Sequence, residues 1–198
     1  MDEEIEIINT NTRVEKLKNF LNSKRKQLIT SLILFILIII AFFGYQEFKS
    51  SSKEKLANRF NSIVTNFETG KKENINKNLI EIIITKDKTY SPLAFFFLLD
   101  KGLITSSDEI NSYFDILINE VSLDKEIKNL TIYKKGLFNS EFVQENELLN
   151  ILNPIIKSDS IWKPQALYLM AEFYLSKNQK QKSKEFFNQI VEMENVSP

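Results

Sequence analysis

The strongest constraint on this chain is an uncharged run from Gln27 to Gln46, whose centre is almost wholly aliphatic and aromatic. At a rise of about 1.5 Å per residue, a helix of this length matches a bilayer hydrocarbon core of about 30 Å. A helix also satisfies its own backbone hydrogen bonds there, which an open strand does not. We therefore predict a transmembrane helix over 28–45, a tail of residues 1–27 with a basic amphipathic helix, and a domain of residues 46–198.

Basic residues crowd the N-terminal end of this run. Lys24, Arg25 and Lys26 directly precede it, whereas Glu47 follows it and Lys49 is the nearest cation on that side. Single-span proteins keep such basic flanks in the cytoplasm. The sequence thus predicts a cytoplasmic N-terminus set by Lys24, Arg25 and Lys26, with the large C-terminal domain outside the inner membrane.

Two other kinds of segment can contain an apolar run with basic residues at one end. A cleaved secretory signal also places basic residues before an apolar stretch, but its stretch is usually about 7 to 15 residues long. The sequence Phe42-Phe43-Gly44-Tyr45 also offers no small-x-small cleavage site. A buried core helix is seldom apolar on every face with cations at one end. The membrane span is therefore the favoured prediction.

Composition excludes several kinds of chemistry. The sequence has no Cys and no His, which rules out disulfides, thiol chemistry, Cys or His zinc sites and histidine bases. Lys and Arg together number 26, as do Asp and Glu, and the absence of a basic stripe in residues 46–198 argues against nucleic acid as a partner. With only 4 Gly and 4 Pro, few tight turns are expected, which favours an all-α fold.

The remaining candidates for catalysis are acidic residues close in sequence. They form three pairs: Asp108 with Glu109, Asp124 with Glu126, and Glu145 with Glu147. Side chains one or two positions apart on a helix point in different directions and do not share a substrate. We therefore expect no enzyme, and no cofactor, metal or small-molecule substrate.

Apolar periodicity predicts a series of helices after the span. One ends before Gly70, and another, around Ile75–Ile83, could also be read locally as a strand. Ser106 and Glu109 form a capping box for a later helix. The other predicted helices are one from Tyr90 to Gly102 with Pro in its first turn, and those at 125–138, 141–157, 162–176 and 179–194.

Two of the predicted helices begin alike. Tyr90-x-Pro92-x-Ala94 lies 72 residues before Trp162-x-Pro164-x-Ala166, and half that spacing is close to the length of a helix-turn-helix repeat. The last unit resembles a tetratricopeptide repeat in its large, small and aromatic positions: Leu167, Met170, Ala171, Tyr174, Asn178, Ser183, Phe187 and Ile190. The alternative is an unrelated bundle of helical hairpins.

A wider resemblance covers nearly the whole chain. Its features, in order, are Val14-Glu15-x-Leu17-Lys18-x-Phe20-Leu21, the basic patch, the single span, a helix leading to Gly70, and the unit from Trp162 to Tyr174. Together they resemble the YfgM-like family of bacterial inner-membrane proteins. The resemblance implies a periplasmic tetratricopeptide-like domain that is ancillary to the Sec translocon and associates with periplasmic chaperones or exported clients.

The expected site follows from the repeat. Stacked helix pairs leave a concave face lined by the first helix of each pair. By analogy, Gln165, Tyr168 and Glu172, with Phe96 and Asp100, point toward that face and form a groove for extended or helical peptides, although core packing is the preferred interpretation for Phe96. The expected function is a membrane-anchored protein-binding module. The alternatives are a scaffold for envelope assembly or cell division, and a helical cell-wall enzyme whose catalytic Glu would be buried with a raised pKa.

Overall fold

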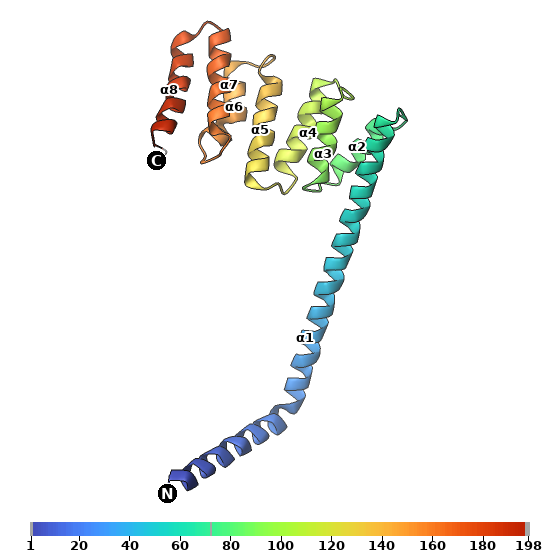
Figure 1. The fold of residues 1–198 in the computed structure, drawn as a ribbon, viewed down its shortest axis with the longest axis vertical. Helices are drawn as coiled ribbons and strands as arrows, with labels where there is room; N and C mark the ends of the chain where they lie inside the picture. The colour runs from blue at the N-terminus through green and yellow to red at the C-terminus, as the bar shows by residue number, and fades with distance from the viewer. Residues whose placement is uncertain (1, 72, 197–198) are drawn as a thin grey trace. The chain divides into compact units, whose positions relative to one another are not determined.

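The computed structural model describes residues 2–71 and 73–196, which form eight helices and no strand (Figure 1). The all-α prediction is therefore confirmed. The helices are α1 Asp2–Glu68, α2 Ile75–Ile84, α3 Tyr90–Asp100, α4 Ser107–Asn119, α5 Lys125–Asn139, α6 Glu145–Ile156, α7 Lys163–Ser176 and α8 Lys180–Val196. The chain divides into two compact units, Met1–Lys55 and Leu56–Pro198.

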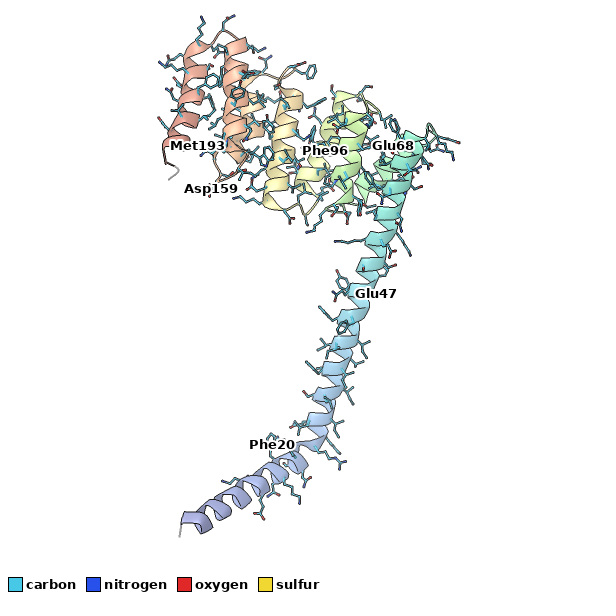
Figure 2. All side chains as sticks on the ribbon, viewed as in Figure 1. Phe20, Glu47, Glu68, Phe96, Asp159 and Met193 are labelled. Atoms are coloured by element: carbon cyan, nitrogen blue, oxygen red, sulfur yellow. The ribbon has the colours of Figure 1, made fainter. Side chains whose placement is uncertain are left out.

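The first unit is the part of α1 that ends at Lys55. Its apolar segment, residues 28–45, is exposed along its whole length, and α1 is long and apolar enough to cross a membrane (Figure 2). None of the most apolar stretch is buried, which does not fit a core helix of a soluble protein. A signal sequence near an N-terminus passes the same test of length and composition.

Helices α1, α3 and α7 end in the same way, with a residue in the left-handed conformation two positions after the helix. These residues are Gly70 at φ 82°, Gly102 at φ 61° and Asn178 at φ 58°. After α1, the Lys71 N–H reaches back 2.8 Å to the Asn66 carbonyl, which satisfies an acceptor that the helix leaves open. The predicted stops at Gly70 and Gly102 are thus confirmed.

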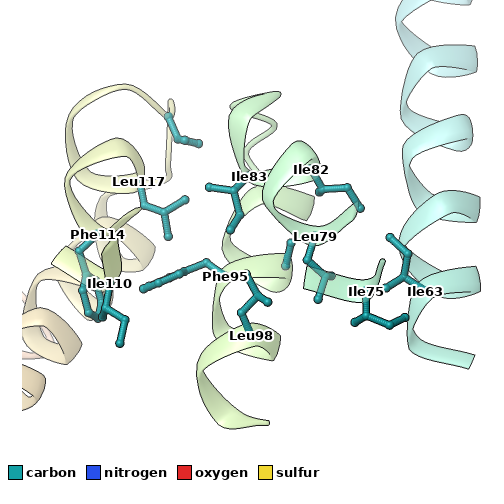
Figure 3. Close-up of a cluster of buried hydrophobic side chains, with 12 residues drawn as sticks. Ile63, Ile75, Leu79, Ile82, Ile83, Phe95, Leu98, Ile110, Phe114 and Leu117 are labelled. Atoms are coloured by element: carbon teal, nitrogen blue, oxygen red, sulfur yellow. The ribbon is translucent and has the colours of Figure 1, made fainter. Parts of the chain in front are cut away.

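A first hydrophobic core joins the last turns of α1 to α2, α3 and α4 (Figure 3). Phe95 and Phe114 are fully buried at its centre, with ring centroids 4.7 Å apart in an edge-on arrangement. The run that could also be read as a strand is helical: Ile82 and Ile83 are buried in this core, whereas Ile84 is 57 % exposed. One face of α2 therefore carries its apolar residues inward.

A second hydrophobic core lies among α5, α6 and α7, with Phe186 of α8 packed against it. The Trp162 ring stacks on Tyr133 with centroids 6.0 Å apart. Helices α5 and α6 approach closely at Gly136, where an added Cβ would lie 2.5 Å from the Leu152 Cδ2 atom. A glycine at this point therefore allows the two helices to pack at this distance.

The two cores meet at a seam between α4 and α5 that combines polar bonds with the packing of Phe138 of α5 against Phe114 of α4. Asn111 and Asn139 exchange amide hydrogen bonds of 3.0 and 2.7 Å, and the Lys135 ammonium lies 2.7 Å from the Asp115 carboxylate. Ile118 packs against both cores. The second unit is thus one body with two apolar centres rather than one continuous core.

The structure changes one predicted boundary. The helix predicted at 141–157 begins at Glu145, because the Phe142 and Val143 N–H groups both bond to the Asn139 carbonyl, at 2.9 and 3.1 Å, and form a turn there. Phe142 is left 66 % exposed in this turn. The alternation of apolar residues alone did not distinguish this turn from a first helical turn.

The similarity between α3 and α7 covers how they begin and end, but not their lengths or their packing partners. Both have Pro in the first turn, as predicted, but α3 has 11 residues and α7 has 14. In addition, α3 packs most closely on α2, the helix before it, whereas α7 packs most closely on α8, the helix after it. The two helices therefore occupy different places within their pairs.

Candidate functional site

The residues predicted on α7 share one exposed face. Gln165, Tyr168 and Glu172 are exposed, while Ala166 and Met170 of the same helix are fully buried. Spacings of three and four residues place the first three on one stripe. Two exposed apolar residues that the sequence interpretation missed adjoin this stripe: Leu175, which is 48 % exposed and lies seven positions after Tyr168 on α7, and Ile161, which is 70 % exposed in the turn before α7.

Tyr168 is the centre of this α7 stripe and is half exposed. Its hydroxyl donates a hydrogen bond of 2.9 Å to the Glu172 carboxylate, and its ring packs edge-on against Phe187 of α8 with centroids 5.7 Å apart. The hydrogen bond to Glu172, together with that carboxylate's charge, raises the pKa of the Tyr168 hydroxyl. The ring is therefore held in place by two contacts while half of its surface stays available.

Phe96 and Asp100, the residues predicted on α3, have different surroundings. Phe96 is partly buried, packs against the first core, and has the Lys134 ammonium 4.6 Å from its ring centroid. Asp100 is exposed in the last turn of α3. The preferred interpretation of Phe96 as a packing residue agrees with this position.

The five predicted residues thus form two separate groups. Phe96 of α3 packs on the first core and contacts Lys134 of α5, whereas Tyr168 of α7 packs on Phe187 of α8. A single groove lined by both groups stays a prediction. The α7 stripe is the part that the side-chain geometry brings together.

The three basic residues before the apolar segment are exposed. Lys24, Arg25 and Lys26 lie on α1 within the first unit, and within the described residues no carboxylate forms an ion pair with them. Their charges are therefore available to the surroundings of the helix.

A polar cluster that the sequence interpretation missed ties together α6, α7 and α8. The Glu145 carboxylate lies 2.7 Å from the Lys182 ammonium and accepts a further bond of 3.4 Å from Gln179. The hydrogen bond from Lys182 is the main reason that the pKa of Glu145 is lowered. Burial, aided by the bond to Glu145, raises the pKa of Tyr174 to about 12. No short-range signal pairs Glu145 with a lysine 37 residues further along the chain.

Three carboxylates of the acidic pairs that were considered for catalysis have partners elsewhere in the domain. Glu145 bonds to Lys182, Glu126 accepts a 2.7 Å hydrogen bond from Ser160, and Asp124 lies 3.7 Å from the Lys88 ammonium. Each of these carboxylates therefore has a partner on another element. Within residues 2–71 and 73–196, no group of three or more acidic side chains is placed to hold a metal ion.

No protein-family model, no curated protein and no solved structure matches this chain.

Proposed function

We propose that this chain is a single-span membrane protein whose α-helical domain binds other proteins near the site of protein export. In this proposal, residues 28–45 cross a bacterial inner membrane, the N-terminus is cytoplasmic, and the domain from Leu56 onward lies in the periplasm. The exposed stripe on α7 is the surface that contacts the bound protein.

The exposure of the apolar segment supports the membrane anchor. Bulky residues such as Phe35, Leu37 and Ile40 are between 57 and 62 % exposed, and water would solvate this surface poorly. A lipid environment removes that penalty, because the segment satisfies its own backbone and presents apolar side chains on all faces. The three exposed cations before it support a cytoplasmic N-terminus.

The packing of α5–α8 supports a tetratricopeptide-like arrangement in this half of the domain. Helices α5 and α6, and helices α7 and α8, form close pairs, and α5 also contacts α7. The small residues Ala171 and Ser183 are buried, and Tyr174 fills the second core beside Phe186. Stacked pairs of this kind commonly bind peptides through side chains of their first helices.

The single observation that carries the binding proposal is the half-exposed ring of Tyr168. Aromatic side chains that are fixed on one side and open on the other are frequent anchors of protein interfaces. Leu175 adds exposed apolar surface on the same face of α7, and Ile161 is exposed in the turn before this helix. A membrane anchor strengthens such a weak site, since it raises the local concentration of the binder beside other membrane components.

The link to export rests on the resemblance of the sequence to the YfgM-like family. A scaffold for envelope assembly or cell division would use the same anchor and the same stripe. The enzyme alternative is less well supported, because the glutamates whose pKa is shifted, Glu81 and Glu145, are shifted downward by hydrogen bonds from Arg59 and Lys182. A general-acid glutamate needs the opposite shift.

Site-specific photocrosslinking in the native host tests this proposal. A photoreactive residue is placed at Tyr168, at Phe43 within the apolar segment, and at the exposed polar residue Gln181 of α8 as a matched control. We expect translocon subunits from position 43, and chaperones or exported chains from position 168 but not from 181. Division or outer-membrane assembly proteins at position 168 would favour the scaffold, and equal capture at 168 and 181 would contradict a specific stripe.

A further inference from the structure

We propose that one face of α1, from Lys26 to Leu37, binds an anionic phospholipid of the leaflet that surrounds the N-terminal end of the span. The inference rests on the proposed membrane span, and it assigns a ligand to a surface that the protein-binding proposal does not use. The bound lipid would have its phosphate at the basic end of the face and one acyl chain along the apolar end.

The observation behind this proposal is a groove of about 550 Å³ on the first unit. The residue types that line it follow one another along the helix in the same order as the chemical groups of a phospholipid. Lys26 stands at one end, the hydroxyl residues Thr30 and Ser31 follow, and Leu34 and Leu37 line the other end. A cation, then hydrogen-bonding groups, then aliphatic carbon correspond to the phosphate, the glycerol esters and the acyl chain.

The dimensions of this face agree with one leaflet. From Lys26 to Leu37 a helix rises roughly 16 Å, at about 1.5 Å per residue, and one leaflet has about half of a 30 Å hydrocarbon core. Lysines near a membrane interface bury their long stems along apolar surface and extend the ammonium into the headgroup region, and Lys26 is at the right depth to do so in this proposal. The groove therefore spans from the headgroups to near the middle of the bilayer.

The polar groups of the groove can engage a headgroup. The Thr30 hydroxyl donates a 2.9 Å hydrogen bond to the Lys26 carbonyl, so its oxygen still accepts a bond from a headgroup hydroxyl. Within the described residues no hydrogen bond engages the Ser31 hydroxyl, which leaves it able to donate to a phosphate or ester oxygen. Phosphatidylglycerol offers both kinds of partner.

Charge selects an anionic lipid. Lys24, Arg25 and Lys26 are exposed and consecutive, and each basic residue close to an anionic membrane surface adds to the attraction. The other end of the apolar segment has Glu47 beside it, which does not attract a phosphate. The site therefore belongs to the N-terminal leaflet.

Charge also argues against a second copy of the chain as the occupant of this groove. Two copies inserted with the same orientation would bring their Lys24-Arg25-Lys26 clusters to the same depth, side by side. The two basic clusters would repel each other, whereas a lipid phosphate is attracted to either cluster. An anionic lipid thus satisfies this face better than self-association does.

The test uses the full-length protein in phosphatidylcholine vesicles that contain traces of spin-labelled phosphatidylglycerol or spin-labelled phosphatidylcholine. The motionally restricted fraction of each probe gives their relative association with the protein. We expect a preference for phosphatidylglycerol that falls about fivefold in Lys26→Gln, the factor for one basic residue near an anionic surface. Lys53→Gln, which removes a cation outside the groove, should leave the preference unchanged.

A second pair of variants separates a seated lipid from diffuse attraction. Leu34→Phe fills the apolar end of the groove, and Leu32→Phe adds the same bulk at a neighbouring depth outside it. The proposal requires that Leu34→Phe releases the restricted phosphatidylglycerol and that Leu32→Phe does not. Equal effects of these two variants, or displacement of the lipid as protein self-associates, would overturn it. A protein that does not float with the vesicles would overturn the membrane span as well. Flotation therefore distinguishes failure of the membrane span from failure of the lipid site alone.

Discussion

Two stretches of this chain, residues 28–45 of α1 and the helix α3, are built from the same kinds of side chain and have opposite surroundings. In the first, Phe35 is 61 % and Leu37 is 57 % exposed. In α3, Phe95 and Leu98 are fully buried. The amount of apolar surface in a helix therefore does not decide where that helix lies.

Length and neighbours account for the difference. Helix α3 has 11 residues, too few to cross a bilayer, and it is joined by short connections to α2 and α4, which cover two of its sides. The unit that contains residues 28–45 has no other helix to cover them. An apolar helix without protein neighbours needs another apolar medium, which is the physical basis of the proposed span.

The largest expected contrast comes from removing the same ring from each helix. Phe95→Ala leaves a cavity in the first core and should lower the free energy of unfolding of the helical domain by about 3–5 kcal/mol. Phe35→Ala removes a ring that contacts no core and should change that free energy by less than about 0.5 kcal/mol. Urea unfolding of the full chain in detergent, followed by circular dichroism, measures both. Similar losses in the two variants would break the comparison.

An added charge should impair membrane insertion when it is placed in residues 28–45 and not when it is placed in α3. Ile36→Arg places a cation near the middle of the proposed span and should oppose insertion by about 3 kcal/mol. Leu93→Arg changes an apolar residue of α3 that is 46 % exposed, and insertion should be unaffected. Flotation with vesicles and resistance to alkaline extraction give the inserted fraction. If Ile36→Arg inserts as well as the parent chain, residues 28–45 do not cross the bilayer.

A smaller contrast concerns one glycine in each region. Gly102 ends α3 at φ 61°, and Gly102→Ala should destabilise the domain by about 1 kcal/mol, because a Cβ is strained in this conformation. Gly44 lies inside α1 with open space where a Cβ would be, so Gly44→Ala should leave domain stability unchanged. The shift of the urea midpoint measures the two effects. A stable Gly102→Ala variant would mean that the end of α3 adapts without strain.

The smallest contrast is the response to acid. Residues 28–45 contain no carboxylate, whereas the domain has Glu145, whose pKa in the fold is below the unfolded value of about 4.3. Its contribution to stability is present above that value and is lost as pH falls through the lower folded pKa. In Glu145→Gln the urea midpoint should therefore change less between pH 7 and pH 3 than in the parent chain. The matched variant Glu147→Gln, in the same helical turn, should keep the parent response.

Local signals in the sequence were sufficient for most of the helices. Gly70 and Gly102 marked helix ends because they permit a positive φ, and Ser106 marked the start of α4, where its hydroxyl accepts a 3.4 Å bond from the Glu109 N–H. The turn at Phe142 was missed, because its apolar residues continue the helical period while the backbone does not. The spacing of apolar residues indicates which side chains are buried. It does not predict which carbonyl accepts each backbone N–H bond.

The sequence alone did not predict contacts between residues that are far apart along the chain. Gln165, Tyr168 and Glu172 were placed on one exposed face by analogy with helical repeats, and all three are exposed in the structure. The edge-on contact of Tyr168 with Phe187, the Lys134 ammonium over Phe96, and the Glu145 bond to Lys182 all depend on how helices stack. Such pairings join residues 19 to 38 positions apart, and a single sequence does not show them.

The polar bonds at the seam between α4 and α5 have a consequence for the curvature of the helical domain. The Asn111 and Asn139 amides satisfy each other in one relative position of the two helices. The Lys135 ammonium and the Asp115 carboxylate add a second fixed point on the same helices. These polar bonds act together with the packing of Phe138 against Phe114 to fix the angle between the two halves of the domain, and with it the width of any surface that spans them. Asn139→Leu, which removes both amide bonds, should change that angle while the helices remain folded.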